Sequence, residues 1–92
     1  MPEPELFADV HFYPSIEGIV ENGFRCSCYL RKDDSSGLDI CMMLLDGKLM
    51  AGQTKRVGFN FLSGQKTVAA LRAAKTFYLA RASVKFAEAS VV

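Results

Sequence analysis

Cysteine and histidine are scarce in this sequence, and long apolar runs are missing. Its three cysteines are too few, and odd in number, for a disulfide framework. No run of apolar residues is long enough to cross a bilayer. The first five residues are acidic and contain two prolines, unlike the basic start and apolar stretch of a secretory signal. We therefore expect a soluble cytoplasmic protein without a membrane partner.

Charge of one sign is not in excess, because the net charge is only +1, and DNA is not an expected partner. The two halves of the chain differ, however. Residues 1–46 hold nine acidic and three basic side chains, whereas residues 47–92 hold one acidic and eight basic ones. This asymmetry indicates a nucleic-acid or acidic partner, unless strands from the two halves interleave around one sheet and neutralise each other.

The 92 residues suffice for one domain with one modest core, and half of them are hydrophobic. We expect a single domain over residues 1–92, with residues 1–5 as a disordered tail. The dominant pattern is an alternation of apolar and polar residues, which is typical of strands. It predicts strands at residues 6–13, 24–30, 38–45, 55–62, 76–81 and 83–92.

The segments between these strands are rich in turn-forming residues. Residues 15–23 contain two glycines and an asparagine and are expected to form a loop. Residues 66–75 have helix-favouring alanines, but only Val68 and Leu71 form an apolar pair at helical spacing. We expect a loop there, with at most one helical turn. Tight turns are expected at residues 33–37 and 46–47. The fold class is therefore all-β, a small six-stranded antiparallel barrel or sandwich.

Several segments occur in a characteristic order: FADVHFY at 7–13, SIEG at 15–18, GFR at 23–25, YLR at 29–31, DSSG at 34–37 and LMAGQ at 49–53. They resemble the third, C-terminal domain of elongation factor Tu. In that family an alternating strand is likewise followed by an S-x-E-G-type turn and a G-[YF]-R entry to the second strand. The resemblance spans almost the whole chain and implies a six-stranded antiparallel barrel, here as a stand-alone domain.

Two segments depart from that family. The loop after Glu17 and Gly18 is a few residues shorter, carries Glu21 and lacks the arginine that helps the family contact transfer RNA. Residues 80–85 replace the glycine-rich arginine hairpin near the family's C-terminus. The sequence also has no phosphate-binding glycine loop. The resemblance therefore implies a relative of one elongation-factor domain, without delivery of aminoacyl-tRNA.

The cysteines are candidates for chemistry because two of them share a strand face. Cys26 and Cys28 are about 7 Å apart by strand rise. If the hairpin pivots between residues 34 and 35, Cys28 lies opposite Cys41 on the same face. A slip of one residue would send Cys41 to the other face. We expect buried thiols that pack as small hydrophobic groups.

His11 is the only histidine and falls on the outward face of the first strand. With three cysteines it supplies the donor types of a zinc site, but the C-x2–4-C spacing of structural zinc sites is absent. With Asp9 and a serine it supplies the residue types of a catalytic triad, without a motif. We expect no metal, no cofactor and no catalytic residues.

The candidate binding residues combine cations with an aromatic ring, as nucleic-acid surfaces do. Three of them share the outward face of the second strand, and three follow later in the chain. Outward strand faces also carry arginine and tyrosine for solubility and cross-strand pairing. The candidates are Arg25, Tyr29, Arg31, Lys55, Arg56 and Lys75.

We expect a non-enzymatic binding module, monomeric or a small homo-oligomer, that binds another protein through strand edges and the outward side chains of Phe7, Tyr13 and Tyr78. The alternative is an RNA-contacting module related to translation, whose binding weakens steeply with salt. It predicts one contiguous basic patch made of Arg25, Arg31, Lys55, Arg56 and Lys75. A second alternative is an unrecognised small enzyme, which predicts a pocket with His11 beside a nucleophile.

Overall fold

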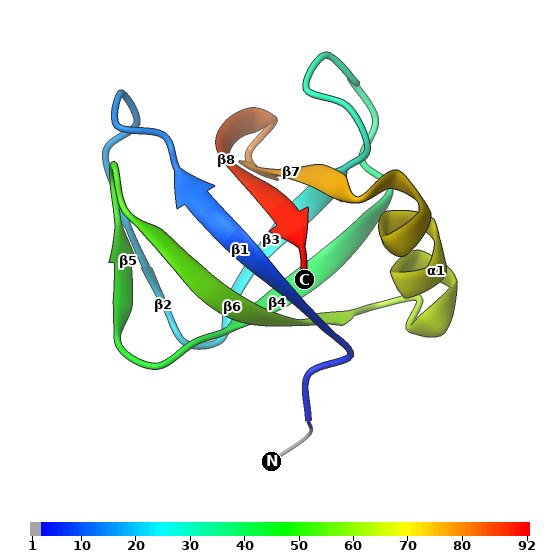
Figure 1. The fold of residues 1–92 in the computed structure, drawn as a ribbon. Coiled ribbons are helices and arrows are strands. Elements are labelled where there is room, and N and C mark those ends of the chain that lie inside the picture. Colours follow the sequence, from blue (N-terminus) through cyan, green and yellow to red (C-terminus); the bar gives the residue numbers. More distant parts are fainter. Residues whose placement is uncertain (1–2) are drawn as a thin grey trace.

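A computed structural model describes residues 3–92 of the protein (Figure 1). The strands are β1 (Leu6–Phe12), β2 (Ile19–Glu21), β3 (Phe24–Tyr29), β4 (Asp39–Leu44), β5 (Lys48–Met50), β6 (Thr54–Phe61), β7 (Thr76–Arg81) and β8 (Val84–Val91). The helix is α1 (Gln65–Ala74). Within residues 3–92 no helix is long and apolar enough to cross a membrane.

Six strands close into an antiparallel barrel in the order β1–β6–β4–β3–β7–β8, with β8 paired to β1. This confirms the predicted six-stranded antiparallel barrel. Closure also interleaves the acidic and basic halves of the chain, because β1 lies between β6 and β8. One result is the ion pair between Asp9 of β1 and Arg56 of β6, at 3.0 Å.

The core fills the inside of the barrel and follows the predicted alternation. In β1 every even-numbered residue is buried. The centre is aromatic: the ring of Phe59 lies 5.5 Å from that of Phe77 and 6.0 Å from that of Phe61. Phe59 and Phe77 are completely buried. Each buried side chain of this kind stabilises the fold by about 2–3 kcal/mol.

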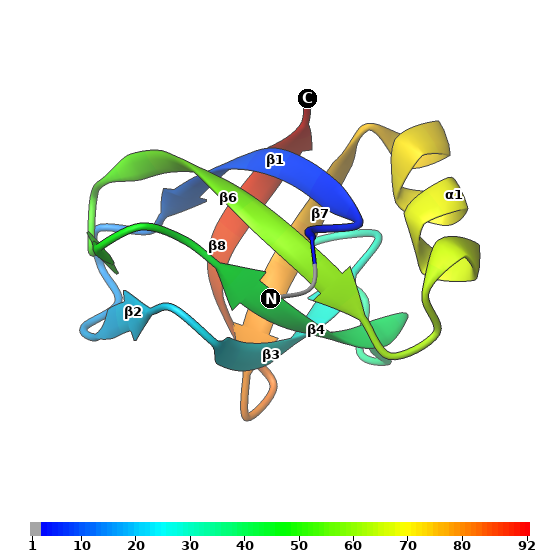
Figure 2. The ribbon, with the colours of Figure 1, turned by 90° about the horizontal axis from the view of Figure 1, so that it is seen from below.

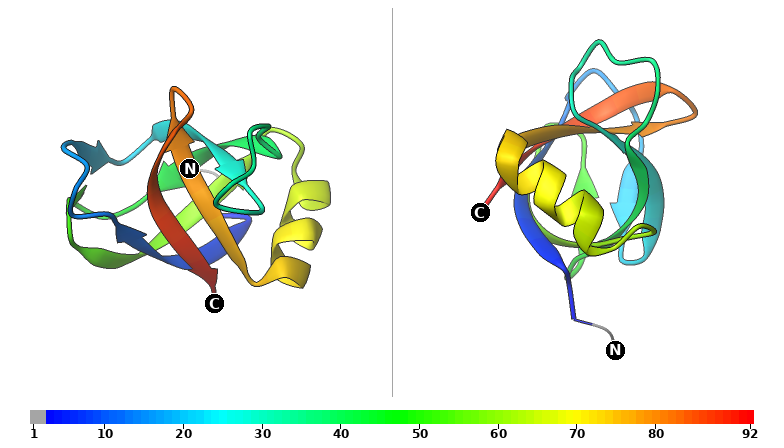
Figure 3. Two further views of the ribbon diagram at one scale, coloured as in Figure 1. Left: turned by 90° about the horizontal axis from the view of Figure 1, so that it is seen from above. Right: turned by 90° about the vertical axis from the view of Figure 1, so that its right-hand side faces the viewer.

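Helix α1 lies across one end of the barrel (Figure 3, right). The prediction of a loop with at most one helical turn at residues 66–75 is wrong, because α1 has ten residues. Its contact with the barrel is narrow and consists of Thr67, Val68 and Leu71, while mostly exposed alanines supply helix propensity. The helix ends at Lys75, whose φ of 70° is left-handed and whose N–H donates to the carbonyl of Leu71.

Strands β2 and β5 form a separate two-stranded sheet at the end of the barrel opposite to α1 (Figure 1). The prediction that residues 15–23 form only a loop is therefore wrong. Val20 of β2 and Leu49 of β5 lie opposite each other and are buried. Ile19 and Met50 form the next pair and are exposed. The buried pair thus closes this end of the barrel, and the exposed pair presents apolar side chains to solvent.

The segment before β1 contacts β6. The N–H of Glu5 donates to the Oδ1 atom of Asn60 at 2.9 Å, and Oε1 of Glu5 accepts from the N–H of Phe61 at 2.8 Å. Pro4 packs so closely on Gly58 that a Cβ atom there would lie 2.6 Å from the Pro4 Cγ atom. Of the tail predicted at residues 1–5, residues 1 and 2 lie outside the described residues.

Candidate functional site

The predicted basic residues lie on different parts of the barrel. Arg25 is on β3, and Arg31 follows β3 in the loop that leads to β4. Lys55 and Arg56 are near the start of β6, and β4 separates β6 from β3. Lys75 follows α1. The structure therefore distributes the five cations over several elements.

The distance between the β3 and β6 cations follows from the strand register. Arg25 lies opposite Met42, and Met42 lies opposite Asn60 of β6. Arg56 precedes Asn60 by four residues, which is about 13 Å along the strand. Arg56 also donates to both carboxylate oxygens of Asp9, at 3.0 and 3.4 Å. The structure does not gather these cations into one contiguous patch.

Tyr29 is buried, although its position was predicted to face outward. It lies opposite Tyr78 of β7, and the ammonium group of Lys85 is 4.1 Å from its ring centroid. The pairing with β7 and the cover by Lys85 explain why period-two alternation fails here. Of the expected apolar docking residues, Phe7 is exposed, whereas Tyr13 and Tyr78 are half-buried.

The three thiols are free and buried, as expected. The register places Cys26, and not Cys28, opposite Cys41. Because the shift from the expected pairing is two residues, Cys41 stays on the inner face. The Sγ atoms of Cys26 and Cys41 are 3.4 Å apart. Hydrogen bonds with Cys26 and Cys28, together with burial, hold the pKa of Cys41 well above its ordinary value. Over residues 3–92, no cluster of three or more such donor side chains is arranged to hold a metal ion.

His11 lies on the outer surface of β1, and its ring is half-buried. Its Nδ1 atom forms a 2.9 Å hydrogen bond with the hydroxyl of Thr54 on β6. Asp9, the expected companion of His11, is instead paired with Arg56. The two residues proposed for a triad thus have separate partners on β6.

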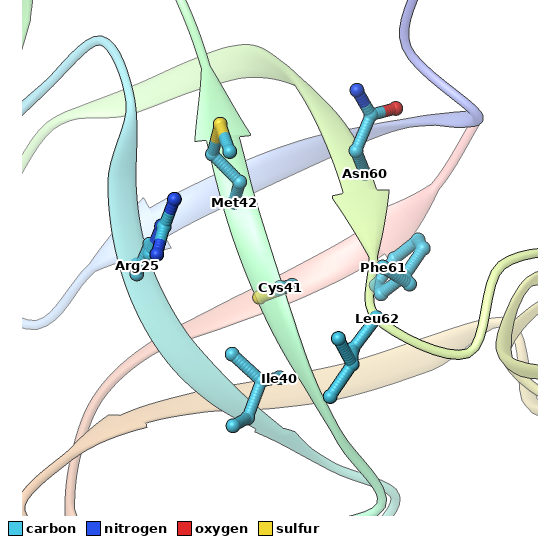
Figure 4. Close-up of a pocket in the computed structure, with 7 residues that line it drawn as sticks. All are labelled: Arg25, Ile40, Cys41, Met42, Asn60, Phe61 and Leu62. Atoms are coloured by element: carbon cyan, nitrogen blue, oxygen red, sulfur yellow. The ribbon is translucent and has the colours of Figure 1, made fainter.

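A surface hollow of about 250 Å³ opens on the outer face of β3, β4 and β6, which lie side by side in Figure 2. We call it the β3–β4–β6 hollow (Figure 4). Its lining consists of Arg25, Ile40, Cys41, Met42, Asn60, Phe61 and Leu62. The volume suits one or two side chains of a partner and is below the 300–1,000 Å³ typical of sites for drug-sized ligands.

Ile40 and Leu62 form the exposed apolar part of this hollow. The side chain of Ile40 is 51% exposed and that of Leu62 is 79% exposed. The N–H of Leu62 donates to the carbonyl of Ile40 at 3.0 Å, which holds the two residues side by side (Figure 4). Leu38, two residues before Ile40, is also exposed. Adjacent exposed apolar side chains of this kind mark interaction sites.

Among residues 3–92, Arg25 is the only charged side chain in the lining of the hollow. The nearby carboxylate of Asp39 is occupied, because its Oδ2 atom accepts from the Thr67 hydroxyl at 2.6 Å and from the Ser63 N–H at 2.9 Å. Partial burial acts to raise the pKa of Asp39, but these hydrogen bonds lower it below its ordinary value. The hollow therefore combines an apolar surface with one positive charge.

No protein-family model matches the chain, and neither the curated proteins nor the solved structures contain a match.

Ile40 and Leu62 were missed as functional residues, although the sequence contains a signal for them. Both occupy outward positions of predicted strands: Ile40 neighbours the inward Cys41, and Leu62 follows the inward Phe61. An apolar residue at an outward strand position is exposed on a closed barrel. What the sequence could not give is the pairing of β4 with β6, which places the two side chains together.

Proposed function

We propose that the chain is a non-enzymatic binding module that docks another protein on the β3–β4–β6 hollow. The observation that carries the proposal is the exposed pair Ile40 and Leu62, fixed side by side at the rim of the hollow. A relationship to the C-terminal barrel of elongation factor Tu is part of the proposal. It is supported by the six-stranded antiparallel barrel and by the segments at residues 15–18 and 23–25.

The closed barrel restricts how a partner binds. Each of the six barrel strands is paired on both sides, so the partner does not add a strand to the barrel. The partner must therefore contact side chains on the barrel surface, and the hollow offers an apolar surface next to Arg25. The complementary partner presents a bulky apolar side chain with a carboxylate beside it, because Arg25 pairs well with a carboxylate.

The RNA alternative required one contiguous patch of five cations. Arg25 and Arg56 lie on strands separated by β4, and Arg56 is already paired with Asp9. An RNA-binding surface would need a different set of side chains. RNA binding is therefore an outcome of the test and not part of the proposal.

Quantitative affinity capture tests the docking site. The immobilised protein is incubated with an extract of the cells that produce it, and the captured partner is identified. The affinity of this partner is then measured for three forms of the protein. These are the wild type, Leu62→Asp and Phe7→Asp. Phe7 is the matched control, since it is 48% exposed and does not line the hollow.

The expected result is at least a tenfold loss of affinity for Leu62→Asp and unchanged affinity for Phe7→Asp, because a charge on the apolar rim is desolvated on binding. Arg25→Gln is expected to weaken the same complex by about tenfold. Equal loss in Leu62→Asp and Phe7→Asp would place the interface elsewhere and reject the site. Salt-sensitive binding of total RNA at 50 mM salt, abolished by Arg25→Ala with Arg31→Ala, would replace the proposal by the RNA module.

A further inference from the structure

A second pocket lies at the end of the barrel that β2 covers. Its volume is about 140 Å³. An apolar cavity of about 150 Å³ is large enough to hold benzene. The pocket therefore has the size of one aromatic ring or one branched apolar group. We call it the mouth pocket.

The walls of the mouth pocket are aromatic and aliphatic. Phe86 packs against Phe12 at a ring distance of 5.3 Å and against Phe24 at 5.9 Å. Ile19 of β2 and Val84 of β8 complete the opening and are 53% and 55% exposed. A ring that enters the pocket would remove apolar surface of both side chains from water, which favours binding.

Two charged side chains also line the mouth pocket, Arg81 of β7 and Glu17 of the loop before β2. Arg81 is held against the wall: its guanidinium carbon lies 5.7 Å from the ring centroid of Phe24. It also lies opposite Val84 across the tight β7–β8 turn, in which Ala82 and Ser83 have φ values of 50° and 67°. The guanidinium of Arg81 therefore lies beside the apolar opening, against the ring of Phe24.

Neither Arg81 nor Glu17 takes part in the ion pairs formed among residues 3–92. Glu17 is exposed, and its carboxylate accepts none of the hydrogen bonds found over the same residues. The two charges differ in their attachment to the pocket, because only the guanidinium packs on an aromatic wall. A carboxylate bound beside Phe24 would gain bidentate, charge-assisted hydrogen bonds from Arg81.

We propose that the mouth pocket binds a small molecule that joins one aromatic or branched apolar group to a carboxylate. The apolar group lies in the pocket against the wall formed by Phe12, Phe24 and Phe86, and the carboxylate lies on Arg81. This site is separate from the β3–β4–β6 hollow, since no residue lines both. The proposal does not depend on the proposed docking of a protein.

Titration followed by NMR tests the ligand class on the unmodified protein. The probe is 3-phenylpropionate, compared with its amide and with 3-phenylpropylamine, which have the same ring. The expected result is a dissociation constant on the order of 1 mM for the carboxylate, with methyl shifts at Ile19 and Val84. The amide is expected to bind about tenfold more weakly, and the amine more weakly still. Equal binding of acid and amide, tighter binding of the amine, or shifts elsewhere on the barrel would overturn the proposal.

Three variants then test the two charges. Arg81→Gln is expected to weaken carboxylate binding about tenfold and to leave binding of the amide unchanged. Glu17→Gln is expected to act in the opposite direction and to strengthen carboxylate binding by up to about threefold, because it removes a nearby like charge. Arg25→Gln is the matched control in the other hollow and is expected to change nothing. Unaltered binding in Arg81→Gln, or an equal loss in Arg25→Gln, would contradict the site. Since the comparison of acid and amide needs no variant, a misfolded variant does not remove the test.

Discussion

The carboxylate of Asp39 and the hydroxyl of Thr67 are joined by a hydrogen bond of 2.6 Å, which ties the first residue of β4 to the first turn of α1. The same carboxylate accepts from the N–H groups of Ile40 and Ser63. Gly64, the N-cap of α1, supplies no side-chain cap. Asp39 therefore stabilises the start of the helix from a neighbouring strand, where the helix itself has no capping side chain.

Asp39→Ala is expected to lower the free energy of unfolding by about 1–2 kcal/mol, because it leaves the helix start without these acceptors. Urea denaturation followed by circular dichroism measures the change. Asp33→Ala is the control, since Asp33 is exposed in the loop between β3 and β4. An equal loss in both variants would show that Asp39 has no special role.

The contribution of Asp39 is expected to depend on pH. Its hydrogen bonds lower its pKa in the folded protein, although partial burial opposes them. A depressed carboxyl pKa gives stability that is present above the unfolded pKa of about 3.9 and is lost as the pH falls through the folded value. The difference in unfolding free energy between wild type and Asp39→Asn should therefore shrink below about pH 4. A difference that stays constant down to pH 2 would contradict the assignment.

Phe59 is expected to be the most sensitive core position. Phe59→Ala should lower the free energy of unfolding by about 3–5 kcal/mol, because it removes a fully buried ring that contacts Phe61 and Phe77. Phe7→Ala on the outer face of β1 should cost less than about 1 kcal/mol. Thermal and urea unfolding of the two variants measure this difference between the two faces of the barrel.

Gly58 is expected to reject any side chain. A Cβ atom there would lie 2.6 Å from Pro4 Cγ and 3.4 Å from the carbonyl oxygen of Leu44, so Gly58→Ala should displace the segment that carries Glu5. The amide of Phe61, which donates to Glu5, should then exchange its hydrogen faster. At Gly37 the nearest atom to a built Cβ is 3.5 Å away, so Gly37→Ala should leave that exchange rate unchanged.

The thiols are expected to be protected in the folded protein. Cys26, Cys28 and Cys41 are buried, and the pKa of Cys41 is raised by its hydrogen bonds with the other two and by burial. Burial keeps iodoacetamide away from all three sulfur atoms, although the hydrogen bond with Cys41 lowers the pKa of Cys28. Labelling of the three thiols at pH 7.5 should therefore be at least about 100-fold slower in buffer than in 8 M urea. Rapid labelling of Cys41 in buffer would show that the β3–β4–β6 hollow gives access to the barrel interior.

Local sequence patterns predicted the barrel strands because alternation is a direct consequence of having one buried and one exposed face. Residues 6–12 and 55–61 show this clearly, and both segments became barrel strands with the expected residues inside. Strands β2 and β5 were not predicted, because a strand of three residues is too short to show an alternation of apolar and polar side chains. Helix α1 was not predicted, because it buries only Thr67, Val68 and Leu71 against the barrel end and so has little apolar periodicity.

The candidate sites depend on pairings that alternation does not encode. Ile40 and Leu62 meet only because β4 pairs with β6. Tyr29 is buried because β3 pairs with β7 and because Lys85 covers its ring. Likewise, Cys26 faces Cys41 because the β3–β4 register differs by two residues from the one expected from the turn composition. Except at Tyr29, the inward or outward face of the barrel-strand residues named here could be predicted from residue types, whereas the identity of cross-strand neighbours required the three-dimensional structure.

The position of β1 has a consequence for how the chain reaches its folded state. Both neighbours of β1 come late in the sequence, β6 at Thr54–Phe61 and β8 at Val84–Val91. During synthesis on the ribosome, β1 must wait unpaired for its partners, with its apolar face open to solvent. Such long-range pairing gives slow folding and a window for aggregation. The nascent chain is thus most vulnerable to aggregation before β8 emerges from the ribosome.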